Sequence, residues 1–471
     1  MNYQVPQHIS KDKIFIINRS TIDNRLDAQY YSADLDLSGF VKLSSVTIVK
    51  GGKRIPKGYG YSNEQTPYHY LRVADMDSDA QVEVNNLMNI SEEVFNILER
   101  YEILEGELAI SIAGTIGKTT ILKNIPIDKR VILTENCAKI LAKTNVDLLP
   151  EYLKTCLEFP IVKKQLDLNY IQTTIPKLGL DKIVGIKIPP IPCIQKQQEI
   201  VDYINEAYIQ KRAKETEAQQ LLDSIDDYLL KELGINIPEV KANIGNRIFI
   251  VQRSELKGRY TPCLYKDSIS LYSTIYENIP LSHLAYINPN TRISSLNNEM
   301  PISFVPMESV NEIYAEINDK NNCIVAGSKG FTRFQEGDLL WAKITPFMEN
   351  GKSAVAKDLI NGYGCGSTEF HVIRPKNNDL LVEYIHTLLH MKIVRQTAKL
   401  YFGGSAGQQR VASDFLESFN VPLPSKTKQQ DIVNYITNIR TRAKALQAEG
   451  KAILENAKRK VEQMIIGEKI G

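Results

Sequence analysis

The sequence has little of several features that would quickly assign it to a class. Its 471 residues include one tryptophan, six histidines and six cysteines (Cys137, Cys156, Cys193, Cys263, Cys323 and Cys365), which form no C-x-x-C pair. That scatter argues against a zinc ribbon and against a disulfide framework. No run of eighteen apolar residues occurs, so no membrane-spanning helix is expected. The first residues, MNYQVPQHISKDK, lack the apolar core of a signal peptide, so we expect a cytoplasmic protein.

The chain also lacks a strong charge of either sign. Its formal net charge is +2, with 43% apolar and 24% charged residues, as in an ordinary globular protein. A chain of this length is too long for one core and predicts two to four domains. An anionic partner would have to be bound by local basic patches, because the surface as a whole is not basic.

What the sequence does contain is a long internal repeat. KQQEIVDYI begins at Lys196 and KQQDIVNYI begins at Lys428, so the offset is 428 − 196 = 232. Three further pairs of blocks follow in the same order at offsets of 231 to 234: residues 13–31 with 247–265, 105–109 with 336–340, and 147–155 with 379–387. Four matched blocks at nearly constant spacing indicate a tandem duplication. Two long repeats favour a pseudo-two-fold object, an internal counterpart of a symmetric dimer.

Each repeat ends in a predicted long helix. Residues 196–233 contain no proline or glycine, and their apolar residues recur at steps of three and four, as they also do after Lys428. This pattern is typical of a coiled-coil seam. Roughly 40 residues at a rise of 1.5 Å make a rod of about 60 Å. We expect the two rods to pack against each other, antiparallel, as a spacer; the alternative is two unrelated amphipathic helices on separate cores.

A possible nucleotide site appears in LAISIAGTIGKTTIL (108–122), which ends like a phosphate-binding P-loop. That motif needs a glycine five residues before the G-K-[ST] glycine. Ile112 stands there instead, and in the second half Pro346 stands five residues before Gly351. The flanking residues read as strands on both sides rather than as a strand followed by a helix. The nucleotide interpretation therefore fails in both halves.

Other catalytic patterns are equally weak. Pro238-Glu239 followed by Glu255-Leu256-Lys257 fits a nuclease pattern loosely, and the aligned first-half residues, Thr21 to Asp23, break it. His386 and His390 are four residues apart on a predicted helix, but no third ligand lies nearby, so a packing or surface role is favoured. The sequence contains no catalytic constellation.

The globular part of the first half offers a basic loop instead. KGGKRIPKGYGYS (50–62) carries four basic residues and no acid, interleaved with Tyr59 and Tyr61. Glycine-rich stretches form loops or hairpin tips, and basic groups beside aromatics suit phosphate and base contacts. The matching place in the second half, INPNTRIS (287–294), carries Asn288, Asn290 and Arg292. A plain solvated surface remains the alternative for such a charge run.

Taken together, these blocks resemble the specificity subunit of type I restriction-modification systems over essentially the whole chain. In the first half the resemblance lies in R-x-D-x-x-Y-Y (Arg25 to Tyr31) and in GGKRIPKGYGYS with YLRVADM. In the second half it lies in SFVPMESV, GDLLWAKITPFMENGK, GYGCGSTEFHVIRP and SAGQQRVASDF. The proline-punctuated segments before KQQ are its most specific part. The second half departs at Arg259 to Tyr265, where the acidic residue of R-x-D is absent.

The resemblance implies an α+β fold with two globular target recognition domains, each a mixed α/β domain with a strand-rich core. Two long antiparallel coiled-coil helices would separate them. We expect a first domain at 1–190, a central helix at 191–236, a second domain at 237–422 and a C-terminal helix at 423–471. Each domain would read one part of a bipartite double-stranded DNA target, with the helices setting the spacing and docking two methyltransferase subunits. Restriction subunits would join where present.

The resemblance also implies that this chain is not itself an enzyme and holds no cofactor or metal. S-adenosylmethionine, ATP and Mg²⁺ would be bound only by partner subunits. The alternatives are a stand-alone DNA-processing enzyme, such as a nuclease or NTPase, and a coiled-coil scaffold that binds no DNA. From motif position, the predicted DNA contacts are Lys53, Arg54, Lys57, Tyr59, Arg72, Lys118, Lys177, Arg292, Arg333, Lys343, Lys352, Gln408, Gln409 and Arg410.

Overall fold

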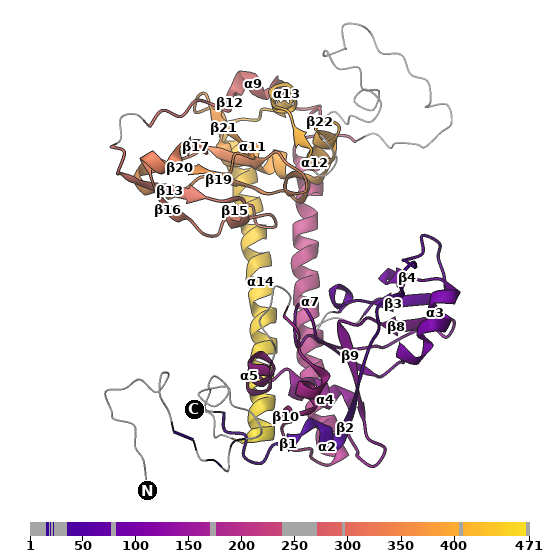
Figure 1. Cartoon of the computed structure of the whole chain (residues 1–471). Helices are drawn as coiled ribbons and strands as arrows, with labels where there is room; N and C mark the ends of the chain where they lie inside the picture. The colour runs from indigo at the N-terminus through magenta and orange to yellow at the C-terminus, as the bar shows by residue number, and fades with distance from the viewer. Residues whose placement is uncertain are drawn as a thin grey trace. The chain divides into compact units, whose positions relative to one another are not determined.

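The computed structural model describes residues 16–17, 19, 22, 35–76, 82–169, 176–237, 271–293, 297–404 and 408–467. The chain divides into two compact units, Met1–Arg212 with Gly450–Gly471 and Ala213–Glu449. Each unit contains a strand-rich part and a portion of both long helices (Figure 1). The sequence blocks at 25–31, 172–174, 238–265 and 405–407 lie outside the described residues.

The first unit contains two four-stranded sheets. The first sheet has the order β2 (Thr47–Gly51), β9 (Cys137–Ala142), β6 (Leu108–Ser111), β7 (Thr119–Ile121), with every pair antiparallel. The second has the order β4 (Met88–Asn89), β3 (Tyr68–Leu71), β8 (Arg130–Leu133), β5 (Glu102–Ile103), and its β3–β8 pair is parallel. β1 (Val41–Lys42) and β10 (Lys187–Ile188) form a separate antiparallel pair.

The second unit repeats the topology of the two four-stranded sheets. Its first sheet has the order β12 (Ala285–Ile287), β21 (Phe370–Pro375), β18 (Leu339–Ala342), β19 (Ser353–Val355). Its second has the order β16 (Asn321–Ile324), β13 (Pro301–Val305), β20 (Tyr363–Gly366), β17 (Thr332–Gln335), again with a parallel central pair. Three two-stranded pairs complete the unit: β11 (Asn278–Pro280) with β24 (Asn420–Pro422), β14 (Val310–Asn311) with β15 (Glu316–Ile317), and β22 (Phe402–Gly403) with β23 (Arg410–Val411).

Side-chain alternation along the central strands explains why each sheet is buried on both faces. In β18, Leu339 and Trp341 pack into the core that the helices share, while Leu340 and Ala342 pack toward the other sheet. β6 divides in the same way, because Leu108 and Ile110 face the helices and Ala109 faces the second sheet. Successive residues of a strand point to opposite faces, so an unbroken apolar run predicts such a doubly covered strand.

The helices surround the sheets and also form the two long rods. In the first unit the short helices are α2 (Leu43–Val46), α3 (Glu92–Leu98), α4 (Pro150–Leu157), α5 (Pro160–Asn169) and α6 (Leu180–Val184). In the second they are α9 (Leu281–Leu284), α10 (Phe347–Asn350), α11 (Val382–His390), α12 (Lys392–Lys399) and α13 (Ser413–Ser418). The long helices are α7 (Ile194–Glu232) and α14 (Lys426–Ile466). No helix in the described ranges is long and apolar enough to cross a membrane.

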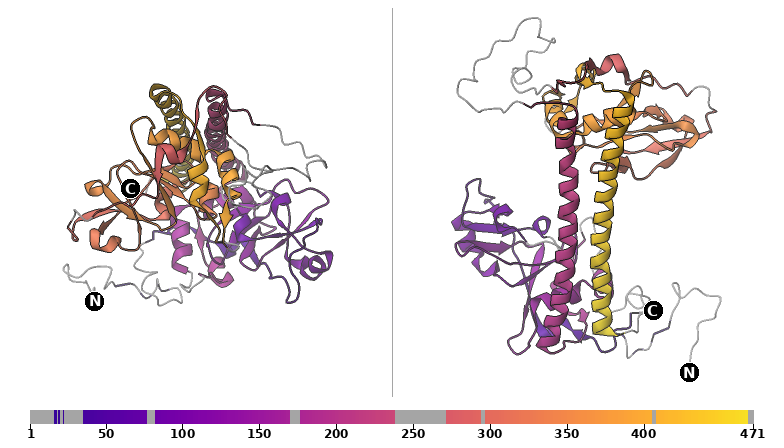
Figure 2. Two further views of the ribbon diagram at one scale, coloured as in Figure 1. Left: turned by 90° about the horizontal axis from the view of Figure 1, so that it is seen from above. Right: turned by 180° about the vertical axis from the view of Figure 1, so that it is seen from behind.

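Within each unit α7 and α14 lie side by side and run antiparallel (Figure 2). In the first unit Lys460 lies over the ring of Tyr203, and Lys458 lies over that of Tyr208. In the second unit Arg442 pairs with Glu217 at 3.0 Å, and the rings of Tyr435 and Tyr228 stack at 4.0 Å. Residue numbers fall on α14 as they rise on α7. The predicted strand-rich halves and antiparallel helices are therefore confirmed.

The KQQ block is repeated because its first glutamine performs the same structural task in both units. The Gln197 side chain accepts a hydrogen bond from Leu149 N at 2.9 Å and donates to the carbonyl oxygens of Asp147 and Pro192 at 2.8 and 2.9 Å. Gln429 makes the equivalent three bonds, to Leu381, Asp379 and Pro424. Both glutamines are fully buried and tie the start of a long helix to the strand-rich part of its unit.

Candidate nucleic-acid interface

The basic loop of the first half, residues 50–62, leaves the end of β2 along a fixed path. A Cβ atom added to Gly52 would lie 2.1 Å from the carbonyl oxygen of Thr134, so only glycine fits there. The next residue, Lys53, donates its backbone N–H to the carbonyl of Leu133 at 3.0 Å, and its own carbonyl accepts a hydrogen bond from the hydroxyl of Tyr70 at 2.8 Å. The loop is therefore anchored at its root.

Beyond this root the basic side chains are exposed. The part of the chain that the structure describes offers no hydrogen bond or ion pair to the ammonium groups of Lys53 and Lys57. Arg54 is 79% exposed and its Nε donates to Glu135 Oε1 at 2.5 Å. Burial raises the pKa of Glu135, but the hydrogen bonds from Arg54, the backbone and Thr134, together with the charge of Arg54, hold that pKa below its ordinary value. An exposed pair of this kind exchanges readily for a phosphate contact.

Two other first-half candidates near this loop already have partners. The hydroxyl of Tyr59 donates to Glu93 at 2.5 Å, while its ring stays exposed. Arg72, just after β3, makes a two-pronged contact with Asp75, at 2.9 Å from Nε and 2.6 Å from Nη2. Arg72 is thus held by an acid of its own turn.

Lys118 lies in a turn that the segment around Lys177 also contacts, although the two are distant in sequence. Lys118 lies in the tight turn between β6 and β7, where Gly117 adopts a positive φ of 77°. The segment around Lys177 pairs with that turn through an isolated bridge to Ala113, and Gly114 N donates to the carbonyl of Pro176 at 3.0 Å. The antiparallel strands on both sides of Gly117 confirm that this turn is a hairpin rather than a strand-to-helix phosphate cradle.

The second half has the corresponding turn, between β18 and β19, and it gathers Lys343, Gln409 and Arg410. Ile344 bridges to Arg410, and Thr345 N donates to the carbonyl of Gln409 at 3.0 Å. Arg410 forms a fork with Glu369, with Nε–Oε2 and Nη2–Oε1 both at 2.8 Å. The hydrogen bond from Arg410 lowers the pKa of Glu369 by more than burial raises it.

The remaining candidates of this turn differ in exposure. The ammonium of Lys352 donates to the carbonyl oxygens of Met307 and Val310 at 3.2 and 3.0 Å, so this charge is bound within the second unit. Gln408 is exposed and Gln409 is partly buried.

A hollow of about 310 Å³ lies beside this turn, and Lys343 and Arg333 line it together with Asn290. The Nε of Arg333 donates to Ser328 Oγ at 3.0 Å, and Arg292, just outside the hollow, is exposed. The segment after β12 that carries Asn290 is fixed by its neighbour Asn288. The side chain of Asn288 accepts from Val372 N at 3.0 Å and pairs with His371.

The structure adds two residues that the sequence reasoning missed. Phe331 lines the hollow with 43% of its surface exposed and meets Phe304 edge-on at 5.1 Å. Lys329, two residues earlier, is exposed as well. The stretch SKGFTRF (328–334) interleaves basic and aromatic residues as the first-half loop does, and that signal could have identified both.

The two histidines that are four residues apart in the sequence both have partners in the second unit. His386 and His390 are packed inside the second unit, where His386 pairs with Ser353 Oγ and His390 with the carbonyl of Glu312, both at 3.0 Å. Among the described residues no group of three or more His, Cys, Asp or Glu could hold a metal ion. Both rings are therefore held by groups of the second unit.

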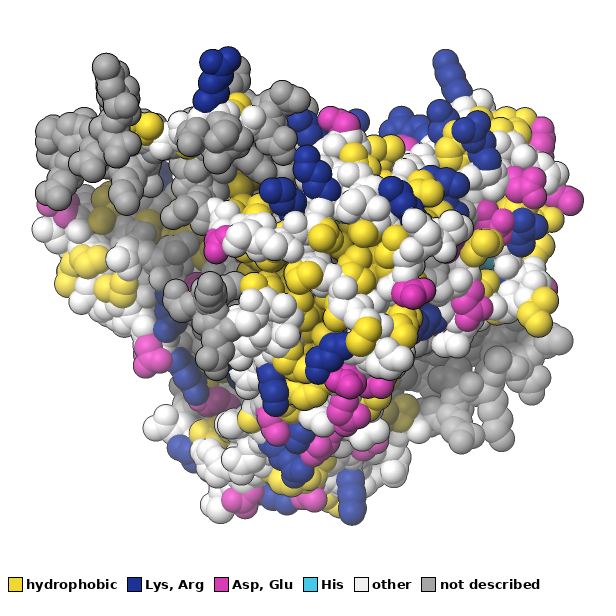
Figure 3. Space-filling model, turned by 90° about the horizontal axis from the view of Figure 1, so that it is seen from below, with side chains coloured by type: hydrophobic (Ala, Val, Ile, Leu, Met, Phe, Trp, Pro, Cys, Tyr) yellow, Lys and Arg dark blue, Asp and Glu magenta, His cyan; other side chains and the backbone are white. Residues whose placement is uncertain are grey.

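Basic side chains are interspersed with acidic and apolar ones on the face shown in Figure 3 and form no continuous basic field there. That distribution agrees with the net charge of +2. On that face an anionic partner would be recognised by local groups rather than by a continuous basic field.

Comparison with known proteins gives a consistent result over most of the chain. The sequence profile of the type I restriction modification DNA specificity domain matches twice, at residues 37–223 and 276–456. Two curated relatives are the specificity subunits of the Escherichia coli type I restriction enzymes EcoEI and EcoAI. They are 33% identical over 191 and 195 residues, which is 40% of this chain and 32% of each relative. The chain thus spans about a third of their length.

Solved structures give matches of wide coverage and low identity. An S subunit of a type I restriction-modification system from M. genitalium is 11% identical, with a TM-score of 0.39, over 90% of this chain and 95% of that one. The HsdS subunit from Thermoanaerobacter tengcongensis is 16% identical, with a TM-score of 0.36, over 91% and 96%. Because the family profile covers both halves, the chain belongs to the type I restriction modification DNA specificity family and carries two copies of its domain.

Proposed function

We propose that this protein is the non-catalytic DNA-specificity subunit of a type I restriction-modification complex. Each strand-rich half would read one part of a bipartite double-stranded DNA target. The observation that carries the proposal is the double match of the DNA specificity domain, once on each half. The curated relatives, described as specificity subunits, support the same role.

The loops at the strand ends supply chemistry that suits this role. In the first half, Lys53, Arg54 and Lys57 are exposed on an anchored loop, as phosphate contacts require. In the second half, Lys343 and Asn290 line a hollow beside the exposed ring of Phe331. Amide and guanidinium groups read base edges, and lysines position the backbone. The two halves differ most in these loops, as expected if each reads a different sequence.

The paired helices would set the separation of the two reading halves and dock two methyltransferase subunits. Restriction subunits would join the same complex where present. In this arrangement S-adenosylmethionine, ATP and Mg²⁺ are bound by the partners and the chain under study supplies sequence recognition alone. A defined separation of two readers predicts a target whose two parts are divided by a fixed number of unread base pairs.

The test is methylation-site mapping of a host genome with and without this gene. A bipartite motif with a fixed gap should appear with the gene and vanish without it. Two variants then separate the halves: Lys53→Ala with Arg54→Ala and Lys57→Ala, called the first-loop variant, and Arg292→Ala with Lys329→Ala. A lost base contact should relax one part of the motif only, whereas a lost phosphate contact should weaken methylation at every site alike.

The alternatives predict different outcomes of the same work. Cleavage of DNA or hydrolysis of nucleotide by the purified chain alone would establish a stand-alone enzyme. Binding of methyltransferase subunits without any binding of DNA would establish a scaffold. Either result would contradict the proposal.

A further inference from the structure

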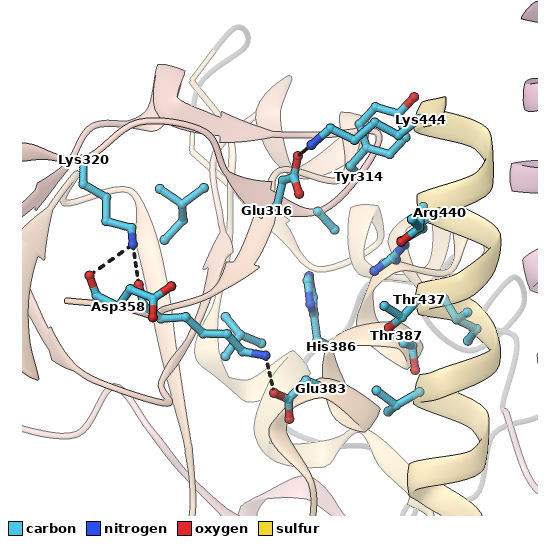
Figure 4. Close-up of a pocket in the computed structure, with 17 residues that line it drawn as sticks. Tyr314, Glu316, Lys320, Asp358, Glu383, His386, Thr387, Thr437, Arg440 and Lys444 are labelled. Atoms are coloured by element: carbon cyan, nitrogen blue, oxygen red, sulfur yellow. Dashed lines mark hydrogen bonds and ion pairs between the residues drawn. The ribbon is translucent and has the colours of Figure 1, made fainter. Parts of the chain in front are cut away.

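A cavity of about 390 Å³ in the second unit has no part in the DNA-reading loops (Figure 4). It is formed by α14, by α11 and by the segment around β15. The basic side chains that line it are Lys320, Lys357, Arg440 and Lys444. The acidic side chains that line it are Glu316, Asp358 and Glu383. The charged lining thus carries one net positive charge.

The three lysines of the cavity are already engaged. Lys444 forms an ion pair with Glu316, and Lys357 pairs with Glu383 at 2.6 Å. Lys320 donates to the carbonyl oxygens of Lys357 and Asp358 at 2.5 and 3.2 Å. The ammonium groups are therefore held at the wall of the cavity.

Arg440 is different, because its guanidinium points into the cavity without a partner (Figure 4). Its Nε is buried and makes no hydrogen bond, and no described residue forms an ion pair with this side chain. Burial has the largest effect on the pKa of Arg440 and lowers it to about 10, although the charges of Asp226 and Glu316 raise it. Asp226 instead accepts a hydrogen bond from Lys392 N at 2.9 Å. Arg440 as a whole is partly buried, but a buried guanidinium nitrogen without a hydrogen-bond partner still costs free energy unless something compensates it.

The first half shows what compensation looks like at the same place. At the offset of 232, Arg440 corresponds to Tyr208 and His390 corresponds to Glu158. The buried carboxylate of Glu158 accepts hydrogen bonds from Lys154, Tyr208 and Thr119 at 2.7, 3.0 and 3.2 Å. It also pairs with Lys458 at 3.0 Å. The first half therefore supplies its own anion to this cluster.

The second half has a neutral group where the first half has Glu158, while an acid, Asp226, stands at the position that corresponds to Lys458 and accepts a hydrogen bond from Lys392 N. His390 replaces Glu158, and burial, followed by the charges of Arg440 and Arg395, lowers the pKa of His390 to about 3, so the ring is neutral. His386, which replaces Lys154, also lines the cavity. Among the described residues no carboxylate makes a hydrogen bond or ion pair with Arg440, whereas in the first half Glu158 binds Lys154 and Lys458 directly.

We propose that the cavity binds a carboxylate, held by the Arg440 guanidinium, that does for the second half what Glu158 does for the first. An arginine fork matches the two oxygens of a carboxylate. One net positive charge favours a monoanion over a phosphate or sulfate dianion. The carboxylate belongs either to a free small molecule or to an acidic side chain of a subunit that docks against α14.

The first experiment titrates the full chain with sodium acetate against sodium chloride at equal ionic strength and pH 7. We compare wild type, Arg440→Met, Arg440→Lys and the control Arg442→Met. Arg442 lies two residues further on the same helix, 66% exposed and paired with Glu217. Wild type and Arg442→Met should gain about 3 to 6 °C in melting midpoint at ten times the dissociation constant of acetate. Arg440→Met should gain nothing, and without acetate it should melt no lower than wild type. Arg440→Lys should respond weakly.

A second experiment measures the affinity of the purified methyltransferase subunits for the same variants. If acetate stabilises wild type and partner affinity is unchanged in Arg440→Met, the carboxylate belongs to a small molecule. If Arg440→Met lowers partner affinity tenfold or more and Arg442→Met does not, the carboxylate belongs to the partner. No response in either experiment, or a larger shift with phosphate or sulfate than with acetate, would overturn the proposal. Neither measurement uses DNA, so failure of the DNA-reading role would leave the result intact.

Discussion

Gln197 and Gln429 provide a controlled test of how the long helices are joined to the two units. Each side chain is fully buried and makes three hydrogen bonds to backbone groups of its own unit. Replacing Gln197 by Leu keeps the volume and removes all three bonds. Leu149 N and the carbonyl oxygens of Asp147 and Pro192, which are part-buried, would then lose these partners.

The expected loss follows from these three groups. A buried polar group left without a partner costs about 1–3 kcal/mol, so three groups at the low end give about 3 kcal/mol. Relaxation and entry of water set that low end, and the more apolar side chain offsets part of the cost. The free energy of unfolding of the first unit should therefore fall by about 3 kcal/mol in Gln197→Leu. Gln429→Leu should do the same to the second unit.

Urea denaturation of the full chain, combined with hydrogen exchange, measures this loss unit by unit. Gln197→Leu should lower the protection of the amides at 147–153 and leave those at 379–385 unchanged, and Gln429→Leu should show the reverse. The matched control is Gln198→Leu. Its side chain bonds only to Asp202 on the exposed face of α7, at 2.8 Å.

Three results would refute the reasoning. The first is that Gln197→Leu loses no more stability than Gln198→Leu, which would mean that the buried bonds contribute nothing net. The second is that the loss of protection spreads equally to both units, which would contradict their description as separate compact bodies. A loss confined to the helix, with 147–153 still protected, would show that the glutamine does not tie the helix to its unit.

Three further predictions concern the first unit. Burial raises the pKa of Glu158, but the charges of Lys154 and Lys458 together lower it by more, so that the pKa lies at about 2. The stability that ionised Glu158 contributes is therefore fully present above the unfolded pKa near 4.5 and is lost as pH falls toward 2. Glu158→Gln should lower the free energy of unfolding, measured by urea denaturation, by about 3 kcal/mol at pH 7 and by much less at pH 3. Gly52→Ala should displace the basic loop, because its Cβ would meet the Thr134 carbonyl at 2.1 Å; DNA affinity should fall while the control Gly60→Ala, which has open space, keeps it. The first-loop variant should flatten the salt dependence of DNA binding by roughly 0.9 per lost phosphate contact, and an unchanged slope would leave the loop as plain surface.

The repeat and the helices could be predicted from sequence because their signals are local or nearly identical in both halves. The KQQ block marks the glutamine that bonds back to the strand-rich part, and the proline-punctuated strand before it provides the carbonyls of Pro192 and Pro424. Apolar residues at steps of three and four gave the paired faces of α7 and α14.

The state of individual basic side chains could not be predicted, because it depends on partners distant in sequence. Lys352 and Lys53 look alike in the sequence, yet the ammonium of Lys352 is bound by two carbonyls about 45 residues away, while Lys53 is exposed. Arg410 is held by Glu369 across 41 residues. Charge patterning finds basic loops, but tertiary contacts decide which charges in them are available to a phosphate.

The same distinction explains how duplication can produce new sites. Both halves keep the backbone contacts that fix the fold, such as those of Tyr152 and Tyr384, whose hydroxyls donate to Pro190 and Pro422. The side chains of the buried polar cluster, by contrast, differ between the halves. In the first half Glu158 closes that cluster, whereas in the second half Arg440 points into an open cavity. A polar cluster whose charges are all paired stabilises its unit. A cluster with an unpaired charge gains the same stabilisation only when it binds a ligand of opposite charge. In the absence of any ligand, Glu158→Gln should therefore lower the stability of the first unit, because it breaks a paired cluster. Arg440→Met should raise the stability of the second unit, because it removes an unpaired charge.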